Sequence, residues 1–183
     1  MQHEKIDQEI SELMKEATAA AKSKNYTRAV KLVEAALSKI QKSNLLYSHA
    51  SYTKIIPYYQ KAGLYSEVES YCLNYLVPSI RAAFKKGMSQ RCKEIQAVHF
   101  YQNIAKIYDK LRLAAKREKE IDDEARFLKE YEFYENKWKE LKPVAEKLEL
   151  EKEYKEILDV FGSKISEWPL SIRSRFESLI KNT

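Results

Sequence analysis

The chain contains very few residues that end a helix. Glycine occurs three times and proline four times among 183 residues, so few positions can form a β-turn. Apolar residues recur instead at the i, i+3, i+4 and i+7 spacing of one helical face. Apolar residues make up 44% of the chain and charged residues 33%, a balance typical of thin, well-solvated elements in a soluble protein. The sequence therefore predicts an all-α fold.

The stretch 24–37 shows this spacing most clearly and predicts a tight turn followed by a helix. Ala29, Val33 and Ala36 share one helical face, and Tyr26 is placed to pack across the turn. Small residues at two of these positions allow a neighbouring helix to approach closely. The matching face of the preceding helix consists of Leu13, Ala17 and Ala20. Together the two segments predict an antiparallel helical hairpin.

This pattern resembles the tetratricopeptide repeat, whose hairpins place an aromatic residue in the turn and small residues at these offsets. The resemblance is best over residues 9–37, weaker over 48–76 and faint over 141–165, while 88–140 shows paired helices without the motif. It implies a single domain, 1–183, built as a short right-handed stack of antiparallel helical hairpins, a TPR-like α-solenoid. Because the last hairpin of such a stack has no neighbour, a C-terminal capping helix is expected.

Four hairpins and a final helix divide the chain. The predicted hairpins span 3–42, 46–86, 89–140 and 141–166, and the capping helix spans 169–181. Pro57 and Pro78 are expected to bend or interrupt the helices of the second hairpin. Pro143 suits the first turn of a new helix or a kink in a continuous one, and we favour the kink. A helical bundle without repeats is the alternative fold.

No motif in the chain carries catalytic or cofactor chemistry. His3, His49 and His99 lie far apart, and none forms the i, i+4 pair or the Glu-x-x-His motif of helical metal sites. Glycine-rich phosphate loops, GxSxG and HExxH are absent. The acidic residues of 118–156 alternate with Lys and Arg, which indicates a solvated face. The sequence predicts a protein without catalytic residues, metal or cofactor, and therefore not an enzyme.

The cysteines and the N-terminal residues indicate in which cellular compartment the protein is expected. Cys72 and Cys92 each fall on a predicted apolar helix face, so we expect small buried hydrophobes. A disulfide between them would require an oxidising compartment. The N-terminal residues lack the basic flank and apolar core of a signal peptide, and no apolar run approaches the roughly 20 residues of a membrane helix. We expect a cytoplasmic protein that does not bind a membrane.

Five polar or aromatic residues are candidates for a partner-binding groove. They lie off the main apolar stripes of the helices that carry them, and the resemblance implies that the first helices of successive hairpins line a concave surface. Ordinary solvent exposure is the alternative for each. The groove candidates are Lys54, Tyr58, His99, Asn103 and Lys106.

A basic segment forms a second candidate surface. Residues 80–120 hold eleven Lys and Arg against four Asp and Glu, whereas 121–160 hold thirteen acidic against eight basic residues. The predicted basic patch flanks the break at Gly87 and consists of Arg81, Lys85, Lys86, Arg91 and Lys93. Such a patch can bind phosphate groups or an acidic protein surface. Alternatively, the two segments complement each other within the fold or between two copies.

These features favour a binding protein. The predicted function is a helical-repeat module that binds a protein or peptide as an adaptor, regulator or inhibitor. One alternative is nucleic-acid binding through the basic 80–120 segment, and another is a cytoplasmic immunity-type antagonist of a toxin or enzyme. The sequence is compatible with both a monomer and a homo-oligomer.

Overall fold

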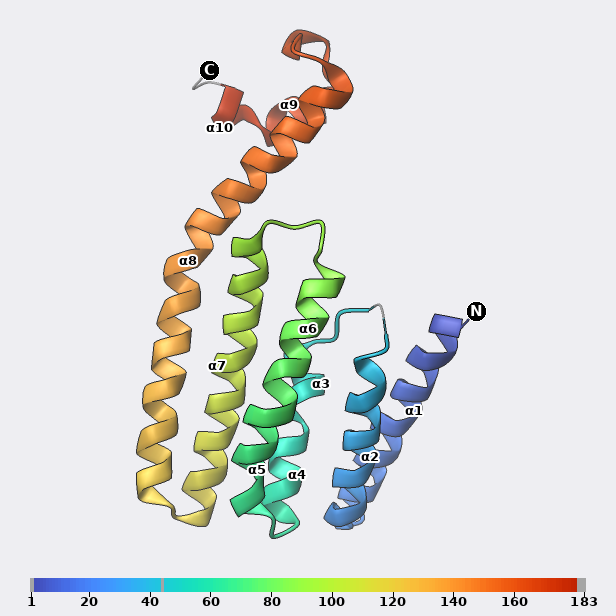
Figure 1. Cartoon of the computed structure of the whole chain (residues 1–183), viewed down its shortest axis with the longest axis vertical. Coiled ribbons are helices and arrows are strands. Elements are labelled where there is room, and N and C mark those ends of the chain that lie inside the picture. Colours follow the sequence, from blue (N-terminus) through green and yellow to red (C-terminus); the bar gives the residue numbers. More distant parts are fainter. Residues whose placement is uncertain (1, 44, 181–183) are drawn as a thin grey trace.

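The computed structural model describes residues 2–43 and 45–180. Helices account for 85% of these residues, and no strand occurs among them, which confirms the all-α prediction. Figure 1 shows α1 to α8 arranged roughly side by side in a row, with α8 extending beyond the others and α9 and α10 beside its extended end.

The first hairpin forms as predicted. It consists of α1 (Gln2–Lys22) and α2 (Tyr26–Ile40). Lys24 in the turn has a positive φ of 61°, and the side chain of Asn25 caps α2 by accepting a hydrogen bond from the backbone N–H of Arg28 (3.1 Å). Ala17, Ala29 and Ala36 are completely buried, so the two helices are in close contact.

Prolines shape the second hairpin, which consists of α3 (His49–Thr53), α4 (Ile55–Lys61), α5 (Tyr65–Tyr71), a π-helical turn (Cys72–Leu76) and α6 (Val77–Gly87). Pro57 has no N–H to donate to the carbonyl of Thr53, and the helix breaks directly after that residue, between α3 and α4. Before Pro78, the N–H of Val77 donates to the carbonyl of Cys72 in the wider π geometry. The predicted interruption is therefore a widened turn, and the chain stays helical from α5 to α6.

The third hairpin pairs α7 (Lys93–Glu118) with α8 (Ile121–Phe161), joined by a turn in which Lys119 has φ 65°. In α8 the apolar residues Ile121, Ala125 and Leu128 recur at helical spacing, but they do not mark the buried side of the helix. Ile121 is 79% exposed, whereas Phe127 is 1% exposed and its ring lies 6.3 Å from that of Tyr108 on α7. The larger aromatic ring occupies the interface, which turns the other three side chains outward.

The predicted fourth hairpin, 141–166, does not form, because α8 continues through this region. Pro143 lies inside the helix, and Figure 1 shows the second half of α8 leaning away from the axis of its first half. Residues 144–161 contain no glycine, proline, asparagine or serine that would end a helix. Lys–Glu pairs four residues apart also support it. These pairs are Lys142–Glu146, Lys147–Glu151 and Lys152–Glu156.

The C-terminal segment does not cap a hairpin as the sequence predicted for 169–181. After Gly162 (φ 74°) it forms a 3-10 turn (Ile165–Glu167), α9 (Leu170–Arg175) and α10 (Glu177–Ile180); residue 181 lies outside the described residues. Trp168 and Phe176 are buried against Tyr154 of α8, with ring centroids 5.8 and 5.5 Å apart. The aromatic residues of the segment thus cover the extended end of α8, away from the hairpins (Figure 1).

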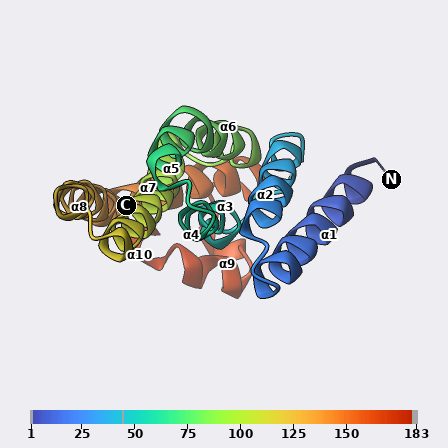
Figure 2. The ribbon, with the colours of Figure 1, turned by 90° about the horizontal axis from the view of Figure 1, so that it is seen from below.

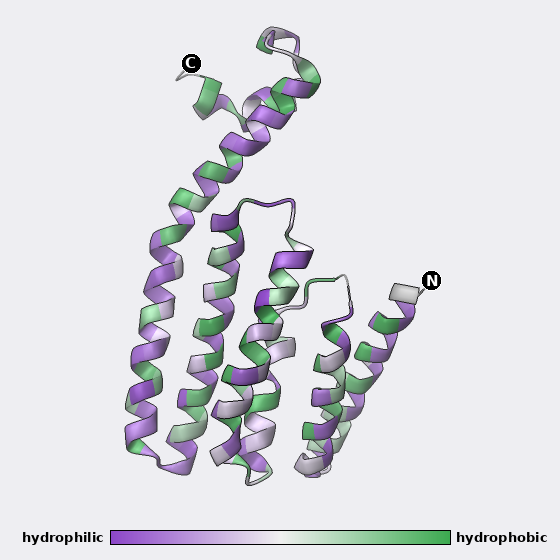
Figure 3. Cartoon of the chain, viewed as in Figure 1, coloured by the Kyte–Doolittle hydropathy of each residue, from purple (hydrophilic) through white to green (hydrophobic). Residues whose placement is uncertain are grey.

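The three hairpins are not copies of one unit. The first has helices of 21 and 15 residues, and the third has helices of 26 and 41 residues. The structure accordingly does not show tetratricopeptide-like repeats. Seen from below, α1, α3–α4 and α7 lie toward one side of the row, and α2 and α5–α6 toward the other (Figure 2). Figure 3 shows mixed hydrophobic and hydrophilic residues along most helices and a largely hydrophilic α8.

Candidate functional site

Three neighbouring cavities lie along residues of α1, α3 and α7. Their volumes are about 480, 320 and 340 Å³. The first and second share His49, the second and third share Lys54, and the first and third share Tyr47. Each cavity has a wall residue in common with both others, so the three cavities adjoin one another, and together we call them the central groove.

The loop before α3 forms one wall of the central groove and is fixed by α1 and α6. Tyr47 Oη and Ser43 Oγ both donate to Oδ1 of Asp7, at 2.6 and 2.7 Å. Burial and this carboxylate raise the pKa of Tyr47 to about 12, so its hydroxyl stays protonated and keeps donating. A Cβ at Gly87 would lie 2.7 Å from a methyl carbon of Leu46. Glycine at this position therefore allows the loop to lie directly against α6.

The largest cavity of the groove has aromatic walls. The rings of Phe84 and His99 stack with centroids 6.0 Å apart and an interplanar angle of 13°. Trp138 of α8 lines the same cavity, and its Nε1 donates to Glu135 (2.9 Å). Burial, together with the charge of Arg91, lowers the pKa of His99, so the imidazole is neutral at pH 7. These walls offer flat surfaces to an apolar or aromatic group.

Asn103 is the chemically most informative residue of this cavity. It is 8% exposed, and its Nδ2 donates to the carbonyl of His99 (2.8 Å). Its Oδ1 is buried without a hydrogen-bond partner. An unsatisfied buried acceptor costs about 1–3 kcal/mol, which a donor on a bound molecule would recover. Because this oxygen is shielded from solvent in the structure, an N–H or O–H group in the cavity reaches it only when the amide of Asn103 turns toward the cavity.

The charged residues that line the groove are mostly basic. Lys54 Nζ donates to the carbonyl of Met14 (3.1 Å) and to Thr18 Oγ1 (2.6 Å), and burial lowers its pKa. Further cations line the first two cavities and form no salt bridge with any described residue; these are Lys106, Lys110 and Arg117. Asp7, already an acceptor for Tyr47, is the one acidic residue lining the three cavities. The groove is thus suited to an acidic or neutral partner.

The structure brings four of the five predicted groove residues to this surface. His99, Asn103 and Lys106 line the largest cavity, and Lys54 lines the other two. Tyr58 lines none of the three; it lies beside Thr18, packed against the hydrophobic core. Sequence reasoning missed the wall residues Leu46, Tyr47, His49, Phe84, Gln102 and Trp138. In the sequence Trp138 lies at helical spacing from the apolar residues Tyr134 and Leu141, and the loop residues carry no periodic signal, so neither stands out as part of a site.

Comparisons of the chain with protein-family models, curated proteins and solved structures gave no match. The resemblance to tetratricopeptide proteins stays a prediction. Within residues 2–43 and 45–180, no group of three or more His, Cys, Asp or Glu is placed to hold a metal ion. None of the helices in the described part of the chain has the length and apolar character needed to cross a membrane.

The predicted basic patch divides into two parts. Arg81, Lys85 and Lys93 surround a cleft of about 360 Å³ between α6 and α7. Lys86 and Arg91 do not line it, because Lys86 Nζ donates to the carbonyl of Ser43 (3.3 Å) and Arg91 Nε pairs with Glu149 Oε1 (2.7 Å). Two of the five predicted cations therefore make contacts within the fold and do not line the cleft.

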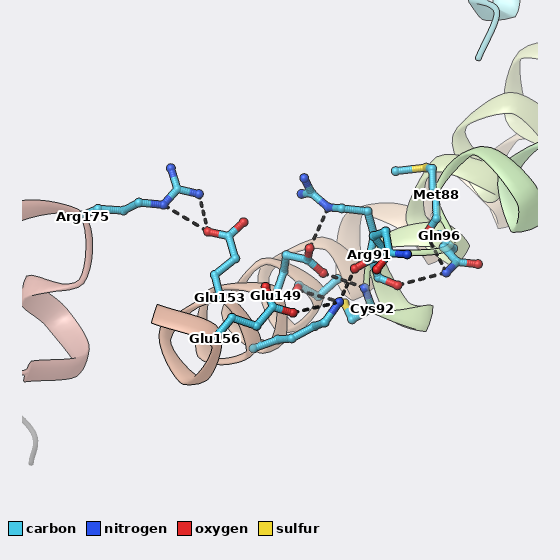
Figure 4. A network of polar contacts seen from close by, with 11 residues as sticks. Met88, Arg91, Cys92, Gln96, Glu149, Glu153, Glu156 and Arg175 are labelled. Carbon is cyan, nitrogen blue, oxygen red and sulfur yellow. Dashed lines mark hydrogen bonds and ion pairs between the residues drawn. The ribbon is translucent and has the colours of Figure 1, made fainter. Parts of the chain in front are cut away.

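Glu149 joins α8 to the start of α7, as Figure 4 shows. It is 6% exposed and accepts a hydrogen bond from the backbone N–H of Cys92 (2.7 Å) while pairing with Arg91. Burial alone would raise the pKa of Glu149, but these contacts keep it below its ordinary value. Lys152 adds a hydrogen bond to the carbonyl of Gln90.

The two cysteines occupy different environments. Cys72 is completely buried, as predicted, and burial raises its pKa to about 12. Cys92 is half-buried at the N-cap of α7, and burial and the nearby Glu149 raise its pKa as well. Both thiols are free and uncharged at pH 7, so neither is an activated nucleophile.

Proposed function

We propose that the chain binds another protein, through an extended peptide segment in the central groove, and acts as an adaptor, regulator or inhibitor without catalysing a reaction. The observation that carries this proposal is the buried, unpartnered Oδ1 of Asn103 on the wall of the largest cavity. A backbone N–H of the bound segment would donate to this oxygen once the amide of Asn103 turns toward the cavity. A neighbouring apolar side chain would enter between Phe84 and Trp138.

The shape of the groove supports a segment rather than a compact small molecule. Each of the three cavities shares a wall residue with the other two, so an occupant can extend from one cavity toward the next. A helix-lined groove of this kind is a recurring mode of peptide recognition. In this binding mode the first helices of the hairpins carry the contacts, as in the arrangement that the tetratricopeptide resemblance implies.

The basic residues of the groove indicate the character of the segment. Lys106, Lys110 and Arg117 lack salt-bridge partners among the described residues, and each would gain from an acidic side chain nearby. Such contacts on the rim of a groove chiefly raise the association rate and select the partner.

Affinity purification from the native cell tests the proposal when it is paired with matched variants. Lys106→Glu together with Lys110→Glu reverses the groove charge, and Lys31→Glu together with Lys129→Glu makes the same change at exposed positions of α2 and α8. We expect the unchanged chain and the second variant to retain one stoichiometric protein, identified by mass spectrometry. The first variant should lose it. Equal retention by both variants would show that the partner does not use the groove.

A further inference from the structure

A second surface lies between α6 and α7 and shares the wall residue Phe84 with the central groove. Its cleft is lined by Arg81, Lys85 and Lys93, with Phe100 and Tyr101 among the other wall residues. The three cations are exposed, and no acidic side chain lines the cleft. None of the three forms a salt bridge within the described parts of the chain. Their mutual repulsion is therefore uncompensated, and a bound anion would relieve it.

Aromatic rings continue from this cleft onto α8. The centroid of Phe100 lies 5.8 Å from that of Tyr101, which lies 6.0 Å from Tyr134, and Tyr134 makes an edge contact with Phe133 at 5.1 Å. Phe133 is 54% exposed. The four rings thus form a connected row that leads from the cleft to the surface of α8, which we call the aromatic row.

Cations lie over the faces of this row. The guanidinium of Arg81 is 4.6 Å from the centroid of Phe100, and Lys137 Nζ is 5.0 Å from the centroids of both Tyr101 and Phe133. Lys137 also has no salt bridge with a described residue. Positive charges and ring faces therefore alternate along a track that three helices build, with the carboxylate of Glu130 near Tyr134.

We propose that this track binds single-stranded nucleic acid. A single strand carries a negative phosphate at every nucleotide and a flat base beside it, which matches four unpaired cations interleaved with aromatic rings. An acidic peptide would satisfy the cations but gains little from a row of aromatic faces. The recognition is independent of base sequence, because stacking and phosphate contacts do not read base edges.

Fluorescence anisotropy with a labelled oligothymidylate 20-mer tests the proposal. Each phosphate contact on a single strand changes the slope of log K against log salt by about 0.7, so four contacts predict a slope of about −3. Replacing the four cations Arg81, Lys85, Lys93 and Lys137 by Gln should weaken binding about tenfold or more at moderate salt and flatten the slope toward zero.

A charge-matched variant controls for net charge. It replaces four exposed lysines outside the track, Lys22, Lys31, Lys116 and Lys155, by Gln. This variant should retain the affinity and slope of the unchanged chain. Equal losses in the two variants would show that only overall charge attracts the strand, and would overturn the proposal.

Ring substitutions separate stacking from charge. Phe100→Leu with Phe133→Leu should weaken binding by about tenfold or more, given roughly 1–3 kcal/mol for each stacked base, and leave the salt slope unchanged. A double-stranded 20-mer and polyglutamate should compete poorly. Competition by polyglutamate equal to that of the oligonucleotide would identify an acidic peptide as the ligand instead. No binding at low salt would exclude the site altogether.

Discussion

The first hairpin and the extended end of α8 show the same helical periodicity but very different packing. In the first hairpin, small residues on both helices are completely buried, including Ala17, Ala29 and Ala36. The end of α8 has one short partner segment, which buries Trp168 and Phe176 and leaves Val160 and Leu170 mostly exposed. Periodicity therefore predicts that a helix forms, whereas burial depends on which neighbours reach it.

The difference implies that the two regions unfold differently. Residues 153–161 are held by the aromatic contacts of Tyr154 and Phe161, the ion pair of Arg175 with Glu153 and the local Lys152–Glu156 pair. Local pairs of this kind contribute only about 0.2–0.5 kcal/mol each. We therefore expect the extended end of α8 to open at a lower free energy than the hairpins.

The largest expected effect comes from overpacking the first hairpin. Ala29→Trp and Ala36→Trp should each lower the free energy of unfolding by about 3 kcal/mol or more, because the added ring has no space between the helices. Urea unfolding followed by circular dichroism measures the loss. Ala125→Trp, at an exposed position of α8, is the matched control and should change little. Stability of the Ala29 and Ala36 variants close to that of the parent would disprove the close contact.

Trp168→Ala should produce a large but local effect. Removing a buried Trp costs about 3–5 kcal/mol, and here the loss falls on the C-terminal segment and the end of α8. Hydrogen exchange should show faster exchange of residues 153–161 and unchanged protection of α1 and α2. A uniform loss of protection throughout the chain would mean that the two regions unfold as one unit.

Glu149→Gln should have an intermediate, pH-dependent effect. Because the folded-state pKa of Glu149 is lowered, its contribution to stability is present above the ordinary pKa of about 4.3 and is lost as the pH falls through the folded-state value. The variant should be less stable than the parent by about 1–3 kcal/mol at pH 7. The difference should shrink toward zero in acid. A constant difference from pH 7 to acid would contradict the ionic role of Glu149.

Gly87→Ala should have the smallest effect on stability and a specific effect on the groove. The new methyl group would displace Leu46 from its place against α6, at a cost of about 1 kcal/mol. Chemical shifts of Tyr47 and His49 should change, while those of α1 and α2 stay the same. Unchanged shifts around the loop would show that the loop does not depend on this contact.

The local features of the fold could be predicted from sequence, and the long-range ones could not. Asn25 as a cap and Gly63 as a turn residue follow from their own chemistry. His99, Asn103 and Lys106 share a face because they are spaced by four and three residues on one helix. The burial of Phe127 could not be predicted from the sequence. Only one side of α8 contacts α7, and the position of α7 decides which residues of α8 are buried.

The remaining parts of the candidate site depend on contacts between distant segments. Leu46 and Tyr47 reach the groove through contacts with Gly87 and Asp7, which lie 41 and 40 residues away in the sequence. Arg91 does not line the cleft formed by the predicted basic patch, because it pairs with Glu149, which lies 58 residues later in the sequence. Such contacts have no periodic signal in the chain.

Asn103→Leu gives the most direct test of the central claim that the groove is a binding site. Leucine is close in size to asparagine and removes the unpartnered acceptor, so the melting temperature of the isolated protein should stay the same or rise. The same variant should lose the partner retained by the unchanged chain. A fall in melting temperature of several degrees, or full retention of the partner, would show that Asn103 serves the fold and would contradict the proposal.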